Sequence, residues 1–148
     1  ISENFTRIFT DLFGGGEAKV YLTDENDVLE SGIEIDAHPP GKIIKNISSL
    51  SGGEKALVAI ALYFAMLSVN PSPFCVLDEI DTALDDSNVI RFARYINTIT
   101  DKTQFLAITH RRGTMENAAV LYGVTMQEEG VSRLLKLDVE SVDATLIR

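Results

Sequence analysis

The sequence predicts an α/β domain with a parallel βαβ core and antiparallel strands at both ends. Two short apolar runs, at 74–77 and 105–108, have the length and composition of buried strands. The segment between them has apolar residues at helical spacing, so strand, helix and strand follow in the order of a parallel βαβ unit. Alternating apolar and polar residues on either side of this core are typical of antiparallel strands.

The first half of the chain begins with a predicted helix over 1–13, whose apolar residues recur at helical spacing and which three glycines end. Two alternating strands follow, around 18–22 and 33–37, joined across an acidic turn. A loop rich in proline and glycine then runs from residue 39 to residue 49.

The second half begins with a thick, almost wholly apolar helix over 53–69, which we expect to be buried. Cys75 lies within the first apolar run, where it is expected to fill the core. The remaining predicted elements are a helix over 86–100, a short helix around 114–119, and strands over 120–126 and 131–137. Both apolar runs are expected to be buried on both faces, as strands of a parallel sheet usually are.

The composition is that of one globular domain and excludes several classes. The 148 residues carry 13 basic and 22 acidic side chains, a net charge of −9, which argues against a domain whose main surface grips nucleic acid. With one cysteine, no disulfide forms within the chain and nothing points to secretion. The apolar stretch 56–69 is too short to span a bilayer, and no targeting segment is visible. A start at Ile1 suggests a fragment.

The first candidate site is the stretch Leu-Ser-Gly-Gly-Glu-Lys, residues 50–55, directly ahead of the long apolar helix. Glycines allow close approach of an anion, and a helix start offers free N–H groups at the positive end of the dipole. Ser51 adds a hydroxyl donor. A serine N-cap behind a flexible lead-in is a common explanation of the same residues, and on their own they are a weak signal of phosphate binding.

The second candidate site is the carboxylate pair Asp78 and Glu79, at the end of the first apolar run. Ligands of open α/β sheets bind at the carboxyl ends of strands. One carboxylate could hold Mg²⁺ while the other orients an attacking water. The pair could also be the solvated end of a strand or cap the next element, and adjacent acids after four apolar residues occur by chance fairly often.

The third candidate site is the pair Thr109 and His110, which ends the second apolar run. A lone histidine is more often structural than catalytic. Arg111 and Arg112 beside it could form a solvated basic corner, or contact phosphate or a partner.

Taken in order, these stretches resemble the motif set of ABC-type ATPases. The signature motif corresponds to 50–55, Walker B to 74–79, the D-loop to 80–85 and the switch histidine to 109–110. Glu54, and Ile80-Asp81 after the Walker B glutamate, are similar to the SMC (structural maintenance of chromosomes) branch, bacterial condensin type. The run Phe9 to Gly16 and the stretch Gly113 to Glu116 are similar to it too.

The likeness runs from about Phe5 to Val139, and residues 140–148 carry no recognisable pattern. The rival interpretations are half of an ABC transporter ATPase, which Glu54 and Ile80-Asp81 disfavour, a coiled-coil DNA-repair ATPase of the same group, and a non-catalytic interaction module.

The resemblance implies the C-terminal lobe of an ABC-type P-loop ATPase head, because the printed sequence contains no G-x-x-x-x-G-K-[ST] P-loop. Residues 1–13 would be the root of the coiled-coil arm. Asp78 would face Mg²⁺, and Glu79 and His110 would be catalytic. Residues implied to contact ATP, mostly that of an opposing head, are Ser51, Gly52, Gly53, Glu54, Lys55, Asp81, Leu84 and Asp85.

The resemblance also implies partners. These are the N-terminal Walker A lobe of the same SMC protein, a second SMC head joined through ATP, a kleisin subunit, and DNA through the whole complex, with no membrane. Hydrolysis of ATP would separate paired heads and serve chromosome condensation and segregation at the nucleoid in the cytoplasm. The isolated lobe is expected to be inactive as an ATPase.

Overall fold

The computed structural model describes residues 1–42 and 47–139. The rest of the predicted loop and residues 140–148 lie outside this description. The elements in chain order are α1 (Ser2–Phe13), β1 (Glu17–Leu22), β2 (Ile33–His38), the 3-10 turn η1 (Ile47–Ser49), α2 (Gly52–Val69), β3 (Phe74–Asp78), α3 (Asp86–Thr98), β4 (Gln104–Ile108), α4 (Arg112–Met115), β5 (Val120–Glu128) and β6 (Val131–Asp138).

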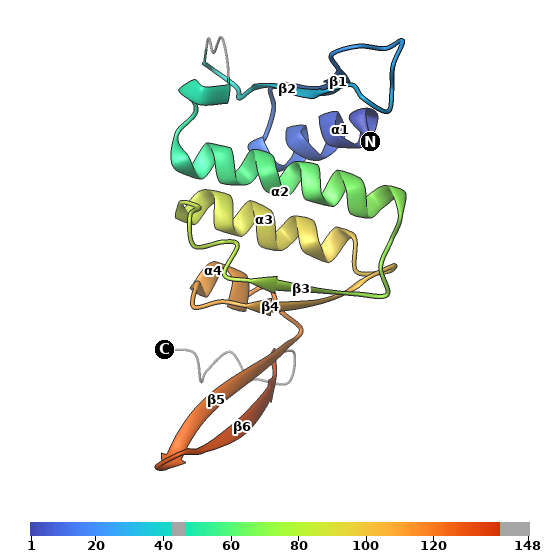
Figure 1. The fold of residues 1–148 in the computed structure, drawn as a ribbon. Helices are drawn as coiled ribbons and strands as arrows, with labels where there is room; N and C mark the ends of the chain where they lie inside the picture. Colours follow the sequence, from blue (N-terminus) through green and yellow to red (C-terminus); the bar gives the residue numbers. More distant parts are fainter. Residues whose placement is uncertain (43–46, 140–148) are drawn as a thin grey trace.

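The molecule is layered, with a hairpin at one side of the helices and a parallel strand pair at the other (Figure 1). The antiparallel β1–β2 hairpin lies on α1, and α1 contacts α2 and α3. α1 ends where Gly14 adopts a left-handed conformation with φ +72°, which glycine reaches without steric cost. Buried residues of α1, α2 and α3 form one core, in which the Phe64 ring packs against Phe92 and Tyr95.

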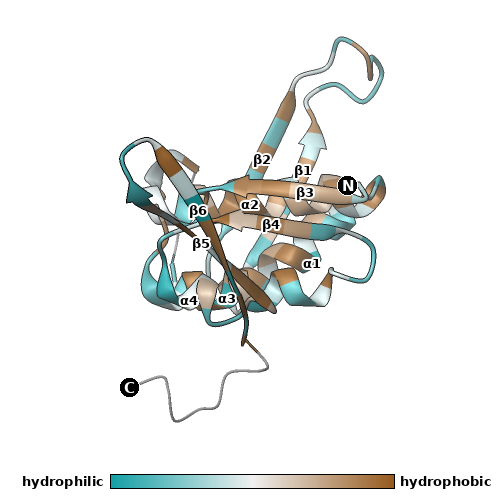
Figure 2. Ribbon diagram, turned by 90° about the horizontal axis from the view of Figure 1, so that it is seen from below, coloured by the Kyte–Doolittle hydropathy of each residue, from teal (hydrophilic) through white to brown (hydrophobic). Residues whose placement is uncertain are grey.

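β3 and β4 form the predicted parallel pair, with Asp78 opposite Ile108 at the carboxyl ends. Their burial differs from the expectation. Cys75 and Leu77 face the core, whereas Phe74 is 60% exposed and Val76 52% exposed. The helices cover one face only, so the prediction of strands buried on both faces was wrong for the described residues. Figure 2 looks onto the uncovered face, which is largely hydrophobic.

The helix predicted at 114–119 is present but displaced, at Arg112–Met115. The backbone N–H groups of Asn117 and Ala118 donate to carbonyls three residues earlier, so the chain continues as turns there. The other predicted helices and strands occur within about two residues of their expected bounds.

β5 and β6 form an antiparallel hairpin that projects beyond the layers (Figure 1). Each residue of β6 is exposed. The exposed apolar side chains of the hairpin are Tyr122, Val124, Met126, Val131, Leu134, Leu135 and Leu137. A surface of this kind is typical of a binding face.

Among the described residues, one helix is long and apolar enough to cross a membrane, judged by length and composition alone: α2. In the structure α2 packs on α1 and buries Leu57, Ala61 and Phe64 in the core. Core helices of soluble proteins meet the same criterion. The expectation that α2 is buried holds for these residues, while Tyr63 and Met66 of the same helix are exposed.

Candidate functional site

Three of the predicted site residues meet at the carboxyl ends of β3 and β4. Asp78 is the last residue of β3, and the backbone N–H of Glu79 donates to the Ile108 carbonyl of β4 at 2.9 Å. His110 follows two residues later, and its Nδ1 lies 3.9 Å from Glu79 Oε1. Both side chains are about two thirds exposed. A carboxylate and an imidazole therefore share an open surface at the edge of the sheet, where parallel sheets place ligands.

The backbone of Glu79 is in the left-handed region with φ +49°, the only non-glycine residue of the described chain with a positive φ. This conformation costs a non-glycine residue on the order of 1 kcal/mol. Thr82 holds it, because its backbone N–H and its hydroxyl both donate to the Glu79 carbonyl, at 3.2 and 2.6 Å. The strand thus ends in a tight turn that directs the Glu79 side chain away from the core.

The loop after Glu79 turns two of its predicted site residues inward. Asp81 is 1% exposed and Leu84 is 3% exposed, so in this conformation neither side chain reaches a ligand on the surface. Asp81 Oδ2 accepts hydrogen bonds from the hydroxyls of Thr109, at 2.7 Å, and Thr114. Asp81 Oδ1 is buried without a partner among the described residues. Asp81 therefore ties this loop to the segment that carries His110.

Ser51 and Glu54 form a reciprocal capping box at the start of α2. Ser51 Oγ accepts from the Glu54 backbone N–H at 3.3 Å, and Glu54 Oε2 accepts from the Ser51 backbone N–H at 2.9 Å. Lys42 Nζ lies 2.7 Å from Glu54 Oε1. The bond from Lys42, followed by the bond from Ser51, holds the pKa of the Glu54 carboxyl below its ordinary value.

The two glycines of this stretch have different surroundings. A Cβ on Gly53 would lie 2.9 Å from the Ala83 carbonyl oxygen, so α2 packs directly on the loop after β3. A Cβ on Gly52 would meet open space. Lys55 is exposed one residue beyond the capping box. Gly53 is thus required by the packing of this chain, and Gly52 is not.

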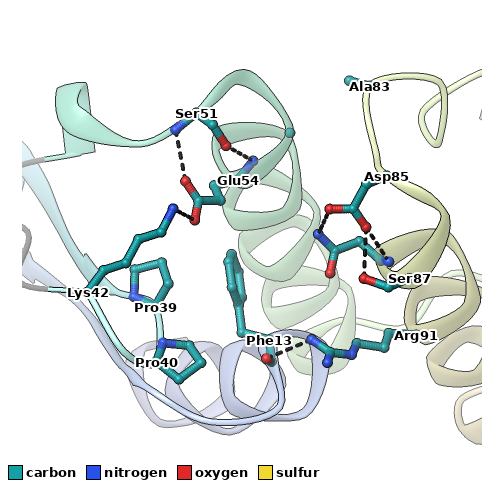
Figure 3. Close-up of a pocket in the computed structure, with 12 residues that line it drawn as sticks. Phe13, Pro39, Pro40, Lys42, Ser51, Glu54, Ala83, Asp85, Ser87 and Arg91 are labelled. Carbon is teal, nitrogen blue, oxygen red and sulfur yellow. Dashed lines mark hydrogen bonds and ion pairs between the residues drawn. The ribbon is translucent and has the colours of Figure 1, made fainter.

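A cavity of about 470 Å³ lies beside this capping box (Figure 3). Its walls come from the end of α1, the segment before residue 43, the starts of α2 and α3, and the loop between β3 and α3. Residues on its walls include Phe13, Pro39, Lys42, Glu54, Asp85 and Arg91. The guanidinium of Arg91 donates to the Phe13 carbonyl at 2.8 Å. Two cations and two carboxylates thus line one cavity at the starts of two helices.

Asp85 caps the start of α3 at this cavity. Its Oδ1 accepts from the Asn88 backbone N–H at 2.8 Å, and from the Ser87 hydroxyl at 2.9 Å. These bonds, that from Asn88 first, lower the pKa of the Asp85 carboxyl.

The predicted residues therefore form two groups. Asp78, Glu79 and His110 share the strand ends, while Ser51, Gly53, Glu54 and Asp85 line the cavity. Both groups lie at the same end of the molecule (Figure 1). Sequence reasoning missed Lys42, whose position twelve residues before Glu54 carries no local signal. It also missed the bond from Thr114 to Asp81, because residues 33 positions apart meet only in the fold.

The family model described as RecF/RecN/SMC N terminal domain matches residues 3–133. Two relatives bear the name chromosome partition protein Smc. The one from Bacillus subtilis (strain 168) is 58% identical over 140 residues, which are 95% of this chain and 12% of that protein. The one from Desulfitobacterium hafniense (strain Y51) is 57% identical over 143 residues, which are 97% of this chain and 12% of that protein. The chain thus spans a small part of these relatives.

Solved structures of SMC heads are similar over the same region. A crystal structure of the SmcHead bound to the C-winged helix domain of ScpA has a TM-score of 0.86 at 45% identity, over 94% of this chain and 42% of that one. A structure from work on ATP-driven dimerization and DNA stimulated activation of SMC ATPases has a TM-score of 0.85 at 42% identity, over 99% of this chain and 87% of that one. The mixed α/β fold therefore matches SMC head ATPase structures.

Proposed function

The chain belongs to the RecF/RecN/SMC family, and from this premise we propose that it is the C-terminal lobe of the ATPase head of a bacterial SMC protein. The order of its motifs supports this assignment, as does the lack of a P-loop in the printed sequence. The Walker A lobe that completes the head would come from the N-terminal end of the same protein. The resemblance assigns α1 to the root of the coiled-coil arm.

The uncovered face of the β3–β4 pair supports the proposal that a second lobe completes the head. Phe74 and Val76 on β3, with Leu106 and Ile108 on β4, are each more than half exposed on this pair. Apolar strands of parallel sheets are normally covered on both faces. We assign the Walker A lobe as the cover, so that the assembled head would bury a surface that this chain alone leaves in water.

The single observation that carries the catalytic assignment is the meeting of Glu79 and His110 at the ends of two adjacent parallel strands. In the assembled head Glu79 would take a proton from the water that attacks the γ-phosphate. His110 would donate a hydrogen bond to that phosphate. Asp81, through Thr109, would keep His110 in position.

The residues present fit Mg²⁺ only together with a nucleotide. Among the described residues, no cluster of three His, Cys, Asp or Glu side chains could hold a metal ion by itself. Asp78 offers one exposed carboxylate, and magnesium is commonly held by one or two carboxylates plus substrate phosphates. Bound there, the ion would neutralise charge on the phosphates of ATP.

Ser51 would act on the nucleotide of an opposing head. As an N-cap its oxygen accepts a bond from Glu54, which leaves the hydroxyl hydrogen free to donate to a phosphate. The open space at Gly52 would allow that phosphate to approach the backbone N–H groups. ATP would thus join two heads, and its hydrolysis would release them. Lys55 and Asp85 would border the same junction.

The remaining partners follow from the relatives. One of the similar SMC heads is bound to the C-winged helix domain of ScpA, and we assign the β5–β6 hairpin of this chain to the same kind of kleisin contact. The exposed apolar residues of the hairpin support this. DNA would be held by the whole complex, at the nucleoid in the cytoplasm, in chromosome partition.

Glu79→Gln tests the catalytic assignment in the complete head. The amide keeps the shape of the side chain but cannot accept the proton, so ATP hydrolysis should fall at least about 100-fold. Steady-state phosphate release measures hydrolysis, and sedimentation with ATP measures pairing, which should persist. Unchanged turnover would remove Glu79 from catalysis.

This chain without its Walker A lobe should release no phosphate above the blank.

A further inference from the structure

The signature stretch of this chain carries a charge that conflicts with its proposed ligand. Glu54 lies in the first turn of α2, the turn whose N–H groups and Ser51 hydroxyl are proposed to receive a phosphate. Its side chain completes the capping box there, because Oε2 accepts the Ser51 backbone N–H at 2.9 Å. An unbalanced negative charge at this position would repel a triphosphate.

Lys42 balances this charge. Its Nζ lies 2.7 Å from Glu54 Oε1, and the Glu54 side chain is 15% exposed, so the pair is partly shielded from water. The bond from the lysine also lowers the pKa of the Glu54 carboxyl, a group that is ionised at neutral pH even at its ordinary pKa. Removal of Lys42 would leave a full negative charge beside Ser51.

The other cation on the cavity wall cannot take over this role. The Arg91 guanidinium donates to the Phe13 carbonyl at the end of α1, at 2.8 Å. Its charge also acts on Asp85, the cap of α3. Lys42 thus balances Glu54 through an ion pair, the charge of Arg91 offsets that of Asp85, and the helix dipoles provide further positive potential at this cavity (Figure 3).

We propose that Lys42 is a positioning residue for the signature stretch, residues 50–55. Lys42 holds Glu54 in the capping box and cancels its negative charge, so that a triphosphate of the opposing head can bind at Ser51. This inference rests on the proposed function. It assigns Lys42 a role through Glu54 and no contact with the nucleotide.

A double-mutant cycle on complete heads tests the inference. The variants are Lys42→Ala, Lys42→Met, Glu54→Gln and each lysine variant combined with Glu54→Gln. The glutamine keeps an oxygen that can accept the Ser51 N–H but carries no charge. The dissociation constant of head pairing is measured by sedimentation with a non-hydrolysable ATP analogue. Lys102→Ala is the matched control, since Lys102 lies with Leu67 and Ser68 at the far end of α2.

Lys42→Ala and Lys42→Met should each weaken pairing about tenfold, a typical effect of one uncompensated charge near an anionic ligand. In the Glu54→Gln background the same changes should weaken it less than about threefold, because the charge to be cancelled is gone. Lys102→Ala should pair like the wild type. Melting temperatures of the lysine variants should stay within about 2 °C of their parents.

Wild-type pairing after Lys42→Ala or Lys42→Met would overturn the inference. An equal loss in both backgrounds would also overturn it, because Lys42 would then act on the nucleotide directly or on the fold. Ser51→Arg distinguishes failure of this inference from failure of the proposed function. A bulky cation at Ser51 should abolish head pairing. If the Ser51→Arg head still pairs, or if the wild-type head fails to pair, the proposed function itself is wrong.

Discussion

At the scale of single residues, neighbouring positions of one motif meet different constraints. Gly53 faces the Ala83 carbonyl at a distance that leaves no room for a methyl group, whereas Gly52 faces open space. Asp81 and Asp85 belong to one loop, yet the first is buried under two threonine hydroxyls and the second caps α3 at the surface. A motif therefore mixes residues that build the fold with residues that face a ligand.

The two glycines give a prediction that separates these roles. Gly53→Ala should lower the melting temperature of the complete head by several degrees, because a Cβ 2.9 Å from a backbone oxygen forces α2 and the loop apart, at a cost of about 1–3 kcal/mol. Gly52→Ala should leave the melting temperature unchanged or slightly higher, since alanine favours helix, but should weaken ATP-dependent pairing. Calorimetry and sedimentation provide the two readouts. Equal effects of both substitutions on stability would contradict this division.

At the scale of elements, α3 begins at a charged cap whose protonation matters. The hydrogen bonds that Asp85 accepts lower the pKa of its carboxyl. The carboxylate therefore stabilises the fold above the ordinary aspartate pKa of about 4. This contribution is lost as the pH falls through the lowered pKa. The pKa of Glu54, at the start of α2, is lowered as well, so its carboxylate also stabilises the fold above the ordinary glutamate pKa and loses this effect in acid. Acid should therefore loosen the starts of both helices.

Asp85→Ala tests this at the level of the helix. The substitution should cost about 1 kcal/mol at pH 7, the usual value of an N-cap, seen as a shift of about 2–4 °C in melting temperature. The difference from wild type should stay constant from pH 7 down to the ordinary aspartate pKa and shrink as the pH falls below it, because the unfolded chain then binds a proton at Asp85 before the folded carboxylate does. Glu129→Ala, at an exposed turn residue, serves as control. A difference that stays constant with pH would show that the charge of Asp85 contributes nothing.

At the scale of the whole molecule, two apolar surfaces lie in water among residues 1–42 and 47–139, the outer face of β3–β4 and the β5–β6 hairpin. Each surface groups several exposed apolar side chains. Single exposed apolar residues are ordinary on a protein surface, whereas a group of them indicates a contact with a partner. The proposed function gives each a separate partner, the Walker A lobe for the first and a kleisin for the second.

A pair of matched substitutions separates the two surfaces. Val76→Glu, on the outer face of β3, should abolish reconstitution of ATPase activity with the Walker A lobe, because a charge would be buried at the junction. Val124→Glu, on the hairpin, should leave reconstitution unchanged and weaken kleisin binding. Both positions are more than half exposed in this chain, so circular dichroism of this chain alone should not change. Full activity of the Val76→Glu head would mean that the outer face is not the junction.

The sequence by itself determined the order and type of nearly all elements, the buried stripe of α1, and the carboxylates and histidine at the carboxyl ends of β3 and β4. These rest on local periodicity and on the rule that parallel strands bring their carboxyl ends together. Only the tertiary structure decided which face of β3–β4 is open, that Asp81 points inward to Thr114, and that Lys42 reaches Glu54. Such contacts join residues distant in the chain, and no local pattern encodes them because they depend on how helices and loops pack.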